Sequence, residues 1–160
     1  MRKAEYRAGK GLQLHRHTLF DLCPELLKLD DAQGDKLFRD FIRHFNYRGR
    51  VFDWTQHLKL YRWLEQSAYA EALEDEHLEA VMAAAVSLWC EKDRSNYRGV
   101  ALVHRNSSTM MLGWKAVGSP ARSGLEVLPS EFELSLSSDF AFCRVSSRGY
   151  PLPQNFKALN

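Results

Sequence analysis

The segment His15-Arg16-His17 brings two imidazole side chains together within three residues. In an extended chain alternate side chains point the same way, so the two rings would share one side with a spacing that suits a metal ion. Cys23 is the nearest further ligand, but a helix predicted to start at Pro24 would bury it. The remaining histidines each lack a second histidine three or four residues away. They are His44, His57, His77 and His104. We therefore predict no metal site and no cofactor.

The three cysteines Cys23, Cys90 and Cys143 are odd in number and far apart, which argues against disulfides and for a reducing compartment, and so for a cytoplasmic protein. Cys90 and Cys143 sit in apolar segments, where a free cysteine is usually a small core residue. The sequence contains neither a nucleophile elbow nor a phosphate-binding loop. An enzyme with a dispersed histidine site, for example His104 with Ser107 or Asp139, stays open as a second alternative.

Residues 44–66, HFNYRGRVFDWTQHLKLYRWLEQ, mix aromatic rings with cations, as nucleic-acid-binding surfaces do. On a helical wheel, however, Trp54, Leu58, Tyr61 and Leu64 fall within one arc, which is typical of an amphipathic helix. Only Trp63 points away from this apolar arc. Tryptophan is enriched at the centres of protein interfaces, so Trp63 is a candidate contact for a partner protein.

Two consecutive predicted helices and the turn between them carry seven cations. They form a candidate nucleic-acid-binding face made of Lys36, Arg39, Arg43, Arg48, Arg50, Lys59 and Arg62. Against this alternative, the second helix begins with Asp53 and Trp54, where a DNA reader usually presents small polar or basic groups.

The C-terminal tail RGYPLPQNFKALN carries apolar side chains at intervals in a polar segment. We expect it to be extended around its two prolines, and either to fold back on its own sheet or to add to a partner as a peptide. Its candidate contacts are Tyr150, Leu152 and Phe156. The edges of the predicted sheet are a further candidate surface.

Helices are predicted in the first half of the chain, over residues 24–29, 35–47, 54–66 and 69–92, following a basic and irregular arm at 1–17. The acidic start of the last helix interacts favourably with its dipole, and the apolar run AVMAAAVSLWC makes it the central core element. The paired carboxylates have structural explanations. Asp30-Asp31 is assigned to a turn, Glu74 to Glu76 to the start of this helix, and Glu131 with Glu133 to the solvent-facing side of a strand.

Strands are predicted in the second half. Residues 100–105 and 109–117 form a hairpin, 131–137 alternate strictly, and 140–145 form the last strand, with a flexible link at 118–124. Helices followed by antiparallel strands define an α+β fold, with about four helices in 18–92 and a four- to five-stranded sheet in 98–145. We expect residues 1–160 to form a single domain, with arm 1–17 and tail 146–160 attached.

The whole chain of 160 residues has a formal net charge of +2, too small to imply a polyanionic partner. The leading interpretation is a non-enzymatic cytoplasmic interaction module, such as an adaptor, inhibitor or accessory subunit. It would bind a partner protein through a sheet edge, the tail or the Trp63 face. No membrane association is expected, because no apolar run approaches the roughly 18 residues that a spanning helix needs.

Overall fold

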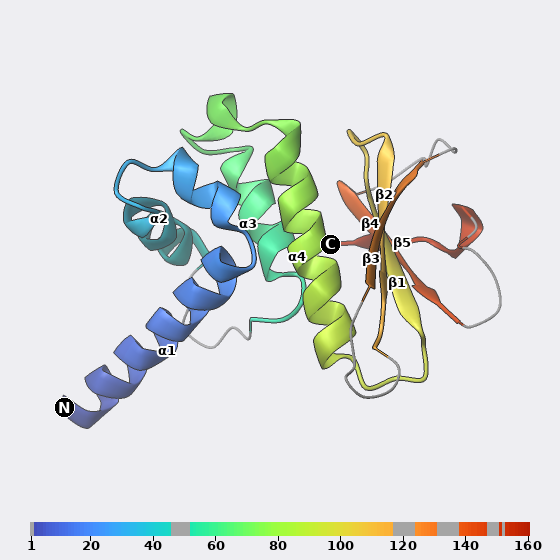
Figure 1. Cartoon of the computed structure of the whole chain (residues 1–160). Helices are drawn as coiled ribbons and strands as arrows, with labels where there is room; N and C mark the ends of the chain where they lie inside the picture. The colour runs from blue at the N-terminus through green and yellow to red at the C-terminus, as the bar shows by residue number, and fades with distance from the viewer. Residues whose placement is uncertain (1, 46–51, 117–123, 131–137, 147–150, 152) are drawn as a thin grey trace. The chain divides into compact units, whose positions relative to one another are not determined.

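The computed structural model describes residues 2–45, 52–116, 124–130, 138–146, 151 and 153–160. Helices occupy the first half of the chain and an antiparallel five-stranded sheet the second, which confirms the α+β class (Figure 1). The chain divides into two compact units, Met1–Val81 and Met82–Asn160. The helix α4 (Asp75–Lys92) runs through the boundary between them.

In the described residues, three α-helices and two 3₁₀ turns precede α4. Their bounds are α1 (Arg2–Asp21), η1 (Pro24–Leu29), α2 (Asp35–Phe45), α3 (Gln56–Leu64) and η2 (Ala70–Ala72). The predicted helices at 24–29, 35–47 and 54–66 are thus present, although the first is 3₁₀ and the third is shorter at both ends. No described helix is both long enough and apolar enough to cross a membrane.

The expectation of an irregular arm at 1–17 is wrong, because residues 2–17 belong to α1. Gly9 and Gly11 each cost a helix only about 1 kcal/mol relative to alanine, and the residues around them are mostly strong helix formers. At the other end of α1 Leu19 and Phe20 are buried. Arg16 also donates to the Asp35 carboxylate (3.0 Å) and to the Gln33 carbonyl (2.9 Å), which ties α1 to the turn before α2.

The single helix predicted over 69–92 is interrupted. Leu73 is extended (φ −74°, ψ 133°) and separates η2 from α4. The Glu74 N–H donates to Nδ1 of His77 at 3.0 Å, and the His77 N–H donates to the Glu74 carbonyl. This reciprocal cap starts α4 at Asp75, so a histidine performs the part that Glu or Gln plays in a capping box.

A carboxylate also fixes the start of α2. Asp30 accepts hydrogen bonds from the backbone N–H groups of Lys36 (2.8 Å), Leu37 (3.0 Å) and Ala32 (3.0 Å). These bonds hold the pKa of the Asp30 carboxyl below its usual value, and the bond from Leu37 has the largest effect. The predicted turn role of Asp30 is therefore confirmed. The helix that follows buries its apolar face through Leu37, Phe41 and Phe45.

The sheet has the strand order β3-β2-β1-β4-β5, with antiparallel pairing throughout. Its strands are β1 (Gly99–His104), β2 (Thr109–Trp114), β3 (Gly124–Pro129), β4 (Phe140–Val145) and β5 (Lys157–Leu159). The predicted hairpin and last strand correspond to β1, β2 and β4. The strand predicted at 131–137 lies outside the described residues.

Two strands were not predicted. β3 follows the segment expected to be a flexible link and includes its last residue, Gly124. β5 belongs to the tail, which is therefore not simply extended: a 3₁₀ turn, η3 (Pro153–Asn155), precedes it. β5 pairs antiparallel with β4, placing Lys157 opposite Phe142 and Leu159 opposite Phe140. The tail thus folds back on its own sheet, one of the two expected outcomes.

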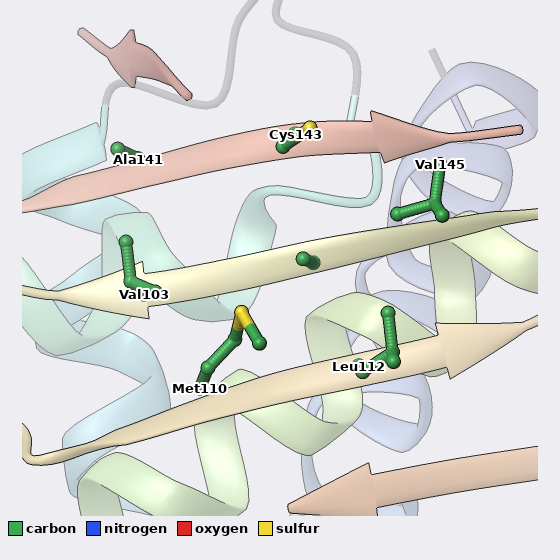
Figure 2. Close-up of a cluster of buried hydrophobic side chains, with 7 residues drawn as sticks. Val103, Met110, Leu112, Ala141, Cys143 and Val145 are labelled. Atoms are coloured by element: carbon green, nitrogen blue, oxygen red, sulfur yellow. The ribbon is translucent and has the colours of Figure 1, made fainter. Parts of the chain in front are cut away.

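The sheet buries side chains on both faces, because all six residues of β1 are buried. On one face a cluster of small and aliphatic side chains crosses β2, β1 and β4 (Figure 2), and includes Val103, Leu112 and Cys143. On the other face Gly113 meets α4: a Cβ added there would lie 2.1 Å from Val86 and 2.9 Å from the Cys90 sulfur. Glycine therefore permits this helix to approach the strand closely.

Candidate functional site

The edge strand β3 presents apolar side chains to solvent. Leu125 is 45% exposed and Val127 54% exposed, and both lie on the same sheet face as Met111 and Gly113, their partners in β2. No described strand pairs with the other side of β3. The neighbouring Ser130 N–H donates to the Ser108 carbonyl, so alternation along the strand turns the backbone groups of Leu125 and Val127 to the side that no described strand occupies.

This edge combines two features that a docking peptide uses. Open backbone donors and acceptors allow another strand to add, and alternate apolar side chains provide contact area and register. Leu128, on the opposite sheet face, packs against the buried cluster and anchors the strand. The sequence predicts docking at a sheet edge but does not identify which edge. The signal was the alternation of Leu125, Glu126 and Val127, which is too short to stand out beside the glycine-rich link.

Trp63 is half-buried rather than fully exposed. Its ring lies 5.7 Å from Phe41, 6.3 Å from His44 and 5.9 Å from Tyr69, measured between ring centroids. Side chains of α2 and of the segment before η2 therefore cover part of the indole. The remaining exposed part can still contact a partner, and the predicted binding role of Trp63 stays a prediction.

The predicted contacts of the tail divide into two groups. Tyr150 and Leu152 lie outside the described residues. Phe156 is half-buried and packs against the cluster of Figure 2, so its ring stabilises the sheet of its own chain. Participation of Phe156 in a partner interface remains untested.

Three of the five described cations of the basic face predicted on α2 and α3 lie near carboxylates of the same chain. Lys36 lies 2.7 Å from Asp40, Arg43 3.9 Å from Asp40, and Lys59 3.5 Å from Asp53. Arg39 is exposed and Arg62 half-buried, whereas Arg48 and Arg50 lie outside the described residues. A cation that is already paired with a carboxylate contributes less to the affinity for a phosphate, because the phosphate must compete with that ion pair. Nucleic-acid binding by this face stays a prediction that these ion pairs do not favour.

The helical conformation of α1 separates the two imidazoles that an extended segment would have brought to one side. Residues two apart on a helix differ by about 200°, so His15 and His17 point in nearly opposite directions. The His15 ring stacks on Phe52 with a centroid distance of 4.0 Å, and His17 lies 3.8 Å from Asp21. Within the described part of the chain, no three His, Cys, Asp or Glu side chains form a group that could hold a metal ion.

The catalytic combination suggested around His104 stays a prediction, and its residues make local contacts in the described structure. His104 is buried, and its Nδ1 accepts the Asn106 N–H at 3.1 Å. Asp139 pairs with Arg105 at 2.9 Å, while Ser107 bonds to Thr109. The Ser107 N–H also donates to the His104 carbonyl (3.0 Å), so these residues help to form the β1–β2 turn and the start of β4.

All three thiols are buried and free. Burial raises the pKa of Cys23 to about 12 and that of Cys90 to about 11, and it also raises the pKa of Cys143. Because the thiolate is the nucleophilic form, these cysteines are poor nucleophiles at neutral pH. The interpretation of Cys90 and Cys143 as core residues is confirmed, and so is the expected burial of Cys23.

Comparison with known protein families gives one result that covers nearly the whole chain. The family described as "Methanobactin biosynthesis cassette protein MbnC-like" matches residues 3–158. No curated protein matches the chain.

Proposed function

We propose, from the premise that the chain belongs to the MbnC-like family of methanobactin biosynthesis cassette proteins, that it is a non-enzymatic accessory protein of this biosynthesis. In this role it binds a partner polypeptide along the open edge of β3. The observation that carries the proposal is the pair of exposed apolar side chains, Leu125 and Val127, on an edge strand.

The chemistry of the described residues supports an accessory rather than a catalytic role. The thiols are buried, and Asp30, His77 and His104 take part in caps and turns. The family is described as belonging to a methanobactin biosynthesis cassette. The other proteins of that cassette are therefore the first partners to test.

The test compares capture of each cassette protein by the tagged chain and by charged edge variants. We expect Leu125→Lys with Val127→Lys to reduce capture of one partner at least tenfold, because a lysine pair repels an added strand and removes its apolar contacts. The control is Ala158→Lys, which places one charge at an exposed position of the opposite edge strand, β5.

Retention of the partner by Ala158→Lys, together with its loss from the β3 variant, supports the proposal. Equal capture by the wild type and the β3 variant would exclude this edge. A further variant, Trp63→Ala, then decides whether the partner uses the exposed part of the indole instead. Circular dichroism of every variant verifies that it is folded.

A further inference from the structure

A pocket of about 380 Å³ lies where β4 and β5 meet. Two cations, Arg144 and Lys157, line it together with the side-chain amides Gln154 and Asn155 and the rings of Tyr97 and Phe142. None of the residues that line the pocket is Asp or Glu. A volume of this size lies within the range of pockets that bind small organic ligands.

The strand register places the two cations on one face. Lys157 lies opposite Phe142, so it is a diagonal neighbour of Arg144, which follows two residues later in β4. Diagonal neighbours in an antiparallel pair are roughly 7–8 Å apart. Two like charges at this separation repel each other, and an anion bound between them would offset this repulsion.

Aromatic rings orient the guanidinium of Arg144. Its central carbon lies 5.5 Å from the centroid of the Tyr97 ring and 5.9 Å from that of Phe142. Contacts of this kind hold an arginine in place without using its N–H donors. The planar donor array therefore remains available to an acceptor in the pocket.

Several other cations in the described part of the chain are paired with carboxylates. Arg105 pairs with Asp139, and Lys115 lies 2.5 Å from Asp93. By contrast, neither Arg144 nor Lys157 forms an ion pair with a carboxylate in the described part of the chain. The pocket is thus a place where positive charge is concentrated without a described counter-charge.

We propose that this pocket binds the carboxylate of an organic ligand. A guanidinium matches a carboxylate with two parallel N–H···O bonds, and Lys157 adds a second charge-assisted donor. The walls formed by Tyr97 and Phe142 suit the carbon skeleton of an organic carboxylate. Inorganic phosphate has no such skeleton. The site lies at the β4–β5 end of the sheet, whereas the docking surface proposed above lies on β3. Neither proposal depends on the other.

The experiment is a titration of the ¹⁵N-labelled full chain, followed through the side-chain amide signals of Gln154 and Asn155. The probes are succinate, a capped tripeptide containing one glutamate, and inorganic phosphate. The variants are Arg144→Gln, Lys157→Gln and the matched control Arg94→Gln. Arg94 is exposed in the same compact unit and does not line the pocket, and its replacement changes the net charge equally.

We expect at least one carboxylate probe to shift both amide signals in a saturable way. Arg144→Gln should weaken this binding about tenfold or more, and Lys157→Gln should also weaken it, while Arg94→Gln leaves it unchanged. If the pocket binds the tripeptide but not succinate, its ligand is a carboxylate of a polypeptide. If it binds both probes, its ligands also include small carboxylic acids.

Three outcomes would overturn the proposal. These are an absence of saturable shifts with either carboxylate probe, an equal loss in Arg94→Gln and Arg144→Gln, and binding of phosphate alone. A matching thermal unfolding midpoint for wild type and Arg144→Gln shows that a lost signal is not caused by misfolding. This control is practicable because the Arg144 side chain is exposed.

Discussion

His57 illustrates how the chemistry of a side chain depends on its surroundings. It is fully buried, and its Nε2 lies 2.9 Å from the Leu19 carbonyl, to which it donates in the neutral ring. The other ring nitrogen, Nδ1, is buried with no hydrogen-bond partner among the described residues. Burial lowers the pKa of His57 to about 4, although the contact with Leu19 opposes the shift. This histidine is a structural contact between α3 and α1.

The lowered pKa predicts a pH-dependent stability. Below about pH 6.5 the unfolded chain binds a proton at His57 that the folded chain does not bind, so the free energy of unfolding falls as the pH drops from 6.5 toward 4. Between pH 7 and 4.5 the loss from this residue should be about 2 kcal/mol. Urea unfolding at these two pH values measures it.

The matched variant is His57→Gln, whose amide can donate to the Leu19 carbonyl but does not titrate. The wild type should lose about 2 kcal/mol more than this variant over the same interval. Contributions from carboxyl groups such as Asp30, whose pKa is lowered, cancel in the comparison. An equal loss in both proteins would show that His57 does not titrate with a lowered pKa.

At the scale of an element, the contact between α4 and β2 depends on the missing side chain of Gly113. We expect Gly113→Ala to lower the free energy of unfolding by about 1–3 kcal/mol, because the new methyl group would overlap Val86 and crowd the Cys90 sulfur. The backbone of Gly113 is not in the left-handed region, so the effect is steric. Urea unfolding measures the change.

Gly124→Ala is the control, since a Cβ at Gly124 has nothing within 4 Å. It should change the stability by less than about 0.5 kcal/mol. Equal stability of the Gly113 and Gly124 variants would mean that α4 does not approach β2 as closely as described. A larger loss at Gly124 would point to a constraint at the start of β3 instead.

At the scale of the whole molecule, α4 decides whether the chain unfolds as one domain. The boundary between the two compact units falls between Val81 and Met82, in the middle of this helix, and both residues are buried. Helix formation is cooperative, so half of α4 does not melt without disturbing the other half. We therefore expect the predicted single domain to unfold in one transition.

Hydrogen exchange in increasing urea tests this expectation with one peptide from α3 and one from β1. Both should lose protection at the same urea concentration. Gly113→Ala, a change within the second unit, should shift both midpoints equally. A shift confined to the β1 peptide would show two independently folding domains and contradict the prediction for residues 1–160.

The sequence alone determined the α+β class, most helices and the strands β1, β2 and β4, because these follow from local periodicity. The apolar spacing of Leu37, Phe41 and Phe45 and the strand formers around Cys143 needed no knowledge of distant residues. Local reasoning also identified the buried cysteines correctly.

Only the tertiary structure decided where weak local signals become regular structure. Arg16 ties α1 to Asp35, β2 provides the backbone partners for β3, and β4 provides those for β5. The same long-range pairing brings Arg144 beside Lys157 and leaves Leu125 and Val127 at an edge. Strand pairing depends on hydrogen bonds between residues far apart in the chain, and a single sequence does not specify which segments meet.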